Sequence, residues 1–169
     1  MNFDCGFTTA DRWFRYRAAA IIVEEGCVLF AQNDRDDYLY SVGGAVTMCE
    51  SAEDAVRREV LEETGVPYEV DRLAFIHENF FEGEGSLAGL QCHEVALYFL
   101  MKPRGSKELC GSSTTSDGLD ERMVWIPLDE LSKYRHFPDF LEEKLRTLQP
   151  GIEHIVTYEM NRRDQKAGG

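Results

Sequence analysis

Residues Gly44 to Val66 read GAVTMCESAEDAVRREVLEETGV and hold the most informative pattern in the chain. Ser51 stands where the N-cap of a helix belongs. Gly65 suits the left-handed position just after a helix, and Pro67 prevents the helix from continuing. The apolar residues between these two ends repeat at helical spacing and predict one buried stripe, formed by Ala52, Ala55, Val56 and Val60. The pattern therefore predicts a helix from Ala52 to Thr64.

Three carboxylates lie beside that stripe. Glu59, Glu62 and Glu63 are spaced i, i+3 and i+4, which places them on one face of the helix. A solvated acidic face is the ordinary interpretation of such a group. The alternative is a site for a hard cation, since Mg²⁺ prefers oxygen ligands and is held by few carboxylates together with substrate phosphates.

The residues around the helix favour the cation site. Five residues separate Gly44 from Glu50, and seven more separate Glu50 from Arg58, where the run REVLEETGV begins. This spacing matches the whole Nudix signature, G-x5-E-x7-R-E-U-x-E-E-x-G-U, in which U is apolar. The chain therefore resembles the Nudix hydrolase family, and the resemblance extends from Arg17 to about Leu148.

The resemblance implies a fold and a metal site. The fold is of the α/β (α+β) class, an α/β/α sandwich with a mixed β-sheet. Carried onto this chain, Glu62 and Glu63 are implied to be the main ligands of Mg²⁺ or Mn²⁺. Glu59 is implied to be a further ligand or the base that activates water. The carbonyl group of Gly44 is a further candidate ligand.

Two more residues of the signature are implied to orient the ligands. Arg58 can form a bidentate bond to a glutamate and fix its rotamer, and Glu50 belongs to the same orienting shell. The implied reaction is hydrolysis of a phosphoanhydride bond in a nucleoside diphosphate-linked compound or a nucleoside triphosphate. Metal-activated water attacks phosphorus in line in such a reaction, so no serine or cysteine nucleophile is required.

Two other functions remain open on the same fold. One is a nucleotide-binding or regulatory domain without hydrolysis, although the three intact glutamates argue against it. The other is isomerisation of an isoprenoid diphosphate, which needs a further catalytic cysteine and glutamate in a context that this chain does not match. Substrate selection in this family lies outside the signature. The chain lacks the SQPWPFP-like segment of NADH-cleaving members, and it has no proline between Pro67 and Pro103, where ADP-ribose-cleaving members often carry one. These absences favour a nucleoside triphosphate or another nucleotide derivative as substrate.

Many Nudix enzymes add an acidic residue from outside the signature. The candidates are Asp117, Asp120 and Glu121, with Glu94 and Glu84 as weaker ones. The stretch from Gly105 to Gly118 is rich in Gly, Ser and Thr, so we expect a mobile surface loop. A further expectation is that the segment from Asp117 to Glu121 closes over the substrate once cations shield its acids.

The rest of the chain predicts strands mixed with few helices. Arg17–Val23 and Cys27–Ala31 are expected to form a hairpin around the turn Glu24–Gly26. Further strands are expected at Tyr38–Val42, Glu69–Phe81, His93–Lys102, Arg122–Ile126 and Ile152–Tyr158, and helices at Pro127–Lys133 and Phe140–Leu148.

Composition limits the partners. The net charge of the 169-residue chain is −13, which repels nucleic-acid polymers but admits a small phosphorylated substrate whose charge cations neutralise. No apolar run is long enough to span a membrane, and no signal peptide is visible. The five cysteines include no Cys-x-x-Cys pair, which favours a reduced, cytoplasmic setting. We expect one domain over residues 1–169, with flexible ends at 1–12 and 160–169, and leave a homodimer open.

Overall fold

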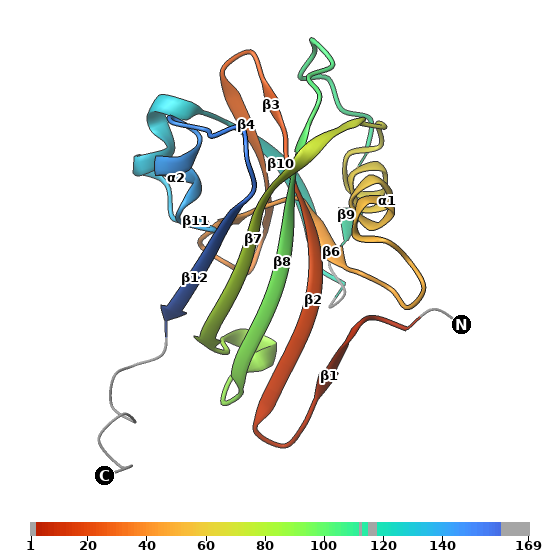
Figure 1. Ribbon diagram of the computed structural model, residues 1–169, viewed down its shortest axis with the longest axis vertical. Helices are drawn as coiled ribbons and strands as arrows, with labels where there is room; N and C mark the ends of the chain where they lie inside the picture. Colours follow the sequence, from red (N-terminus) through yellow and green to blue (C-terminus); the bar gives the residue numbers. More distant parts are fainter. Residues whose placement is uncertain (1–2, 112, 115–117, 160–169) are drawn as a thin grey trace.

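The computed structural model describes residues 3–111, 113–114 and 118–159. Two six-stranded mixed sheets form its centre. Helix α1 (Ala52–Thr64) lies on one side of the strands, and α2 (Leu141–Lys144) lies on the other (Figure 1). The predicted class, mixed α and β with helices on both sides, is confirmed. The expected mixed β-structure is present, and its strands divide between two sheets.

The first sheet carries the long strands. Its order is β1 (Gly6–Thr8), β2 (Arg12–Ile21), β8 (Gln91–Met101), β7 (Val70–Glu82) and β12 (Glu153–Glu159), with β6 (Gly43–Ala45) paired to β2. Strand β2 is parallel to β8, and β7 is parallel to β12, whereas the other pairings are antiparallel. Residues 6–8 belong to the segment expected to be flexible, but they pair with β2. Residues 160–169 lie outside the described residues.

The second sheet is built from shorter strands. Its order is β11 (His136–Phe137), β5 (Leu39–Tyr40), β4 (Cys27–Asn33), β10 (Asp120–Pro127) and β9 (Ser113–Thr114), with β3 (Val23–Glu24) paired to β4. Asp120 and Glu121 therefore begin a strand instead of lying in the loop predicted for them. The short 3-10 helices η1 (Gly85–Leu87) and η2 (Leu128–Lys133) complete the elements.

The predicted hairpin needs a correction in its first arm. The turn lies where it was expected, with Glu25 and Gly26 in the left-handed region at φ 50° and 76°. However, only β3 precedes it, because β2 ends at Ile21 and belongs to the other sheet. The uninterrupted apolar run concealed this change of sheet.

The core explains that apolar run. Ala18, Ala20 and Ile22 pack in one cluster with the buried stripe of α1. Ala19 and Ile21 pack in a second cluster, with Phe30, Phe75 and Leu141 among others. Since alternate residues of a strand point to opposite faces, this end of β2 is buried on both sides. Burial of both faces holds α1 at a fixed position over the first sheet.

Other predicted elements differ mainly in length. The helix expected at Phe140–Leu148 is shortened to α2, and the one at Pro127–Lys133 is the 3-10 helix η2. The strand expected at Tyr38–Val42 is shortened to β5, and β6 begins just after the predicted range and belongs to the other sheet. Within the described residues, none of the helices combines the length and the apolar character needed to span a membrane.

Candidate functional site

Helix α1 has the predicted boundaries. The Ser51 hydroxyl accepts a hydrogen bond from the Asp54 backbone N–H at 3.1 Å, which caps the first turn. Gly65 ends the helix at φ 71°, and its N–H donates to the Leu61 carbonyl. The apolar stripe is buried as expected. With the stripe fixed against the core, the rotation of the helix is fixed as well, and so is the direction of its three glutamates.

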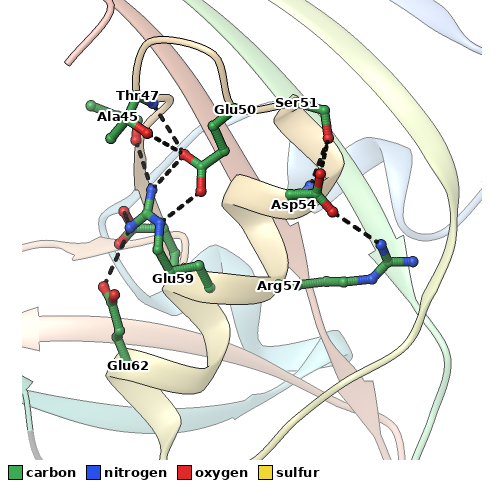
Figure 2. A network of polar contacts seen from close by, with 9 residues as sticks. Ala45, Thr47, Glu50, Ser51, Asp54, Arg57, Glu59 and Glu62 are labelled. Atoms are coloured by element: carbon green, nitrogen blue, oxygen red, sulfur yellow. Dashed lines mark hydrogen bonds and ion pairs between the residues drawn. The ribbon is translucent and has the colours of Figure 1, made fainter. Parts of the chain in front are cut away.

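Arg58 joins this helix to the loop before it. Its Nε donates to Glu50 Oε1 at 2.8 Å, and its Nη2 donates to Glu50 Oε2 at 3.0 Å (Figure 2). Glu50 also accepts hydrogen bonds from the Thr47 backbone N–H and hydroxyl. The hydrogen bonds from the Arg58 guanidinium lower the pKa of Glu50 to about 2, although burial acts in the opposite direction. The Glu50 carboxylate is thus charged and committed to holding Arg58.

The same guanidinium reaches the glutamates of the helix. Arg58 Nη1 donates to Glu59 Oε1 at 2.6 Å and lies 3.4 Å from Glu62 Oε2. Its Nη2 also donates to the Ala45 carbonyl at 3.2 Å. Figure 2 shows Glu50, Glu59 and Glu62 around this centre. The structure therefore brings the two expected orienting residues together with two of the expected ligands, while their roles in catalysis stay predictions.

Glu63 is the buried member of the group. One carboxylate oxygen, Oε1, accepts a hydrogen bond from the Gly43 backbone N–H at 3.2 Å. The other oxygen, Oε2, is buried and has no hydrogen-bond partner among the described residues. Burial, and after it the charge of Glu121, raises the pKa of Glu63 well above its ordinary value. A buried carboxylate with an unpartnered oxygen is costly, and a cation beside it removes that cost.

Gly44 approaches the Glu59 carboxylate closely. A Cβ atom built on Gly44 would lie 2.5 Å from Glu59 Oε1, so a side chain there would displace the Glu59 carboxylate. Burial raises the pKa of Glu59, and Arg58 acts against this rise. The backbone of Gly44 and the carboxylate of Glu59 thus meet at one point, as a shared role in binding requires.

The carboxylates of Glu59, Glu62 and Glu63 do not converge on one point in this structure. Glu62 is 58% exposed in its side chain and turns toward Arg58. Over residues 3–111, 113–114 and 118–159, no three His, Cys, Asp or Glu side chains are arranged to hold an ion together.

The candidates for an additional acidic residue differ in position and in exposure. Asp117 lies outside the described residues, and Asp120 is exposed, as is Glu84. Glu94 is buried in an ion pair with Arg15, at 2.8 Å and 2.5 Å from its Nε and Nη2. Burial alone would raise the pKa of Glu94, but the two arginines Arg15 and Arg17 hold it below its ordinary value. Glu94 is thus neutralised within the protein.

Glu121 is the candidate that the structure brings to the site. It begins β10 and accepts a hydrogen bond from the Tyr40 hydroxyl. Its charge is the strongest of those that raise the pKa of Glu63. The sequence alone did not favour Glu121 over Asp120, because both residues were expected in a loop. In a strand, neighbouring side chains point to opposite faces, so the structure can separate the two.

Sequence reasoning also missed Arg17 and Tyr40. The Arg17 guanidinium donates from Nη2 to the Ser41 carbonyl at 2.6 Å, and its charge acts on both Glu63 and Glu59. A small cavity of about 50 Å³ continues from Arg17 along the sheet face; it is lined by Arg17, His77, Asn79, Glu94, Tyr98, Phe137, Pro138, Asp139 and Glu159. A charged residue inside an apolar strand was the one signal that pointed to Arg17.

Comparisons with known proteins agree with the signature. The NUDIX domain family model matches residues 13–147. A MutT-like protein of Streptomyces ambofaciens is 33% identical over 116 residues, which span 68% of this chain and 65% of the relative. The chain thus spans slightly less than two thirds of that relative's length.

Solved structures agree with the fold. A MutT NUDIX hydrolase from Burkholderia pseudomallei is 27% identical with a TM-score of 0.52, over 70% of this chain and 86% of that one. A MutT protein from Methanosarcina mazei Go1 has a TM-score of 0.60 at 18% identity, over 82% and 94% of the two chains. The family match covers most of the chain and contains the whole helix α1, and we conclude that this protein belongs to the Nudix hydrolase family.

Proposed function

We propose that the protein hydrolyses a phosphoanhydride bond in a small nucleotide derivative and depends on Mg²⁺ or Mn²⁺. The observation that carries this proposal is the buried Oε2 of Glu63, which has no partner among the described residues. It lies on the signature helix beside Glu59. This oxygen supports the cation, and the complete signature around it supports hydrolysis over binding alone.

The donor set fits a hard divalent cation. Glu59, Glu62 and Glu63, with the carbonyl of Gly44, offer the oxygen ligands that Mg²⁺ prefers. Glu121 adds a fifth oxygen donor from the second sheet. A bound cation of this kind polarises phosphoryl oxygens and lowers the pKa of a bound water.

The chain's own residues have separate parts in the reaction. Arg58 fixes Glu59 through a 2.6 Å bond to Oε1 and is itself fixed by Glu50. Burial raises the pKa of Glu59, which favours this carboxylate as the acceptor of a proton from the attacking water. We infer that Glu59 acts as a metal ligand or as the base that activates water.

A small cavity adjoins Arg17, whose charge acts on Glu63. The cavity that starts at Arg17 has a polar lining, and His77 Nδ1 on its wall has no hydrogen-bond partner among the described residues. His77 Nε2 is 2.8 Å from the Thr157 hydroxyl, which donates to Asn79 Oδ1 at 2.6 Å. At about 50 Å³ this cavity has room for water and is too small for a nucleobase. We therefore favour a nucleoside triphosphate or a nucleoside diphosphate-linked compound as substrate on the strength of the family signature alone.

We also propose a cytoplasmic setting without a polymer partner. All five cysteines are free thiols, which suits a reducing compartment. The net charge of −13 opposes binding to nucleic acids.

The test is a screen of phosphate and nucleotide release. Purified protein is incubated with nucleoside triphosphates and nucleoside diphosphate-linked compounds, with Mg²⁺, with Mn²⁺ and with a chelator. We expect metal-dependent turnover of at least one compound and its loss in Glu63→Gln. Binding of a nucleotide without any turnover, across the panel and with both metals, would instead support the non-hydrolytic alternative.

A further inference from the structure

Tyr40 makes a contact that the signature does not account for. It lies in β5, and its hydroxyl donates a hydrogen bond to Glu121 Oε2 in β10. The two strands are not neighbours, because β4 lies between them. The contact therefore crosses the middle strand of the second sheet, over 81 residues of sequence. Tyr40 and Glu121 must therefore lie on the same face of the second sheet, with their side chains directed toward each other across β4.

The same short segment also holds Glu63. Three residues after Tyr40, the backbone N–H of Gly43 donates to Glu63 Oε1 at 3.2 Å. Residues 40–43 thus bond to one carboxylate at each end, Glu121 through Tyr40 and Glu63 through Gly43. Two carboxylates repel each other in a partly buried site, and a cation between them removes that repulsion.

We propose that Tyr40 is a positioning residue that holds Glu121 beside Glu63, so that Glu121 serves as an additional ligand of the cation. The proposal rests on the metal dependence proposed above. Its carrying observation is the pair of hydrogen bonds from residues 40–43 to the two carboxylates.

A phenol is chemically suited to this task. It orients a carboxylate without neutralising it, so the carboxylate keeps its full attraction for a cation. Glu94 shows the contrast, since Arg15 pairs with it at 2.8 Å and cancels its charge. Burial, and after it the hydrogen bond to Glu121, raises the pKa of Tyr40, so the phenol keeps its proton at neutral pH.

The experiment measures Mn²⁺ affinity by electron paramagnetic resonance, without any substrate. The proteins are the wild type, Tyr40→Phe, Glu121→Gln, the double variant and the control Tyr38→Phe. Tyr38 stacks edge-on against Tyr40 at 6.3 Å between ring centroids, so the control removes a neighbouring hydroxyl from the same strand region. Circular dichroism and thermal unfolding check that each variant is folded.

We expect Tyr40→Phe to weaken Mn²⁺ binding about tenfold, as loss of a residue that orients a ligand does. Glu121→Gln should weaken it at least as much, and Tyr40→Phe should add little in the Glu121→Gln background. Tyr38→Phe should bind as the wild type does. Unchanged or tighter binding by Tyr40→Phe, or independent effects of the two substitutions, would overturn the role of Tyr40.

The outcomes separate this inference from the proposed function. If the wild type hydrolyses nucleotides while Tyr40→Phe binds Mn²⁺ normally, the function stands and the inference fails. If Tyr40→Phe does not fold, Glu121→Gln still decides, because unchanged Mn²⁺ affinity there removes Glu121 from the ligand set. Absence of Mn²⁺ binding by the wild type overturns both.

Discussion

Arg58 holds both oxygens of Glu50, with distances of 2.8 Å from Nε to Oε1 and 3.0 Å from Nη2 to Oε2. The pair joins α1 to the loop that precedes it, since Glu50 lies between strand β6 and the helix and Arg58 lies eight residues further along, within the helix. The remaining nitrogen of Arg58 reaches Glu59. One guanidinium therefore sets the distance between the Gly44 backbone and the carboxylates of the helix.

The first prediction compares two neighbouring arginines. Arg58→Ala should lower kcat about 10–100-fold, because Glu59 and the loop lose the group that orients them. Arg57→Ala should have little effect, since Arg57 pairs only with exposed acids, Glu53 at 2.6 Å among them. Steady-state kinetics on the substrate found in the screen measures both. Equal losses in the two variants would mean that Arg58 acts only as a surface charge.

The second prediction concerns stability and pH. The pKa of Glu50 in the folded protein, about 2, lies below its ordinary value of 4.5. The stabilisation by its ion pair is therefore complete above pH 4.5 and is lost as the pH falls toward 2. Glu50→Gln should lower the free energy of unfolding by about 1–2 kcal/mol at pH 7. Urea unfolding at pH 7, 4.5 and 3 should show the difference from wild type shrinking; a constant difference contradicts the assignment.

The third prediction tests Glu63 as a ligand. Glu63→Gln is nearly isosteric and should keep the fold, but it should reduce turnover by about 100-fold or more because an amide is a poor ligand for Mg²⁺. Glu53→Gln is the matched control, since Glu53 lies on the same helix with its side chain 49% exposed. Thermal unfolding should also show that Mg²⁺ stabilises the wild type and not Glu63→Gln. A wild-type rate in Glu63→Gln would remove this residue from the site.

The fourth prediction concerns the close approach of Gly44 to Glu59. Gly44 is not among the glycines with positive φ, so alanine suits its backbone, but the new Cβ would meet the Glu59 carboxylate at 2.5 Å. Gly44→Ala should therefore reduce kcat about tenfold or more by displacing Glu59, with only a small loss of stability. Gly151→Ala has open space around it and serves as the control. Full activity in Gly44→Ala would show that Glu59 moves without consequence.

The sequence predicted the local parts of this protein well and the long-range parts poorly. Helix α1 has its predicted ends because Ser51 and Gly65 act within one turn of them. The crossing from β2 to β3 was missed, since residues 18–22 are buried on both faces and show no alternation. Arg17 and Tyr40 were missed for a related reason: their importance comes from partners far away in the chain, which spacing does not reveal.

The parallel pairings of the first sheet bear on the order in which the chain folds. Arg15 bonds to Glu94 across 79 residues, and Thr157 bonds to Asn79 across 78. Contacts between residues so far apart in the chain form slowly, whereas the Arg58–Glu50 pair joins residues that are close in the sequence. Tyr40 and Glu121, 81 residues apart, belong to the slow class. The proposed metal site therefore combines a local part, the signature helix, with a part that exists only once segments far apart in the chain have paired, so loss of the long-range pairing alone should abolish metal binding.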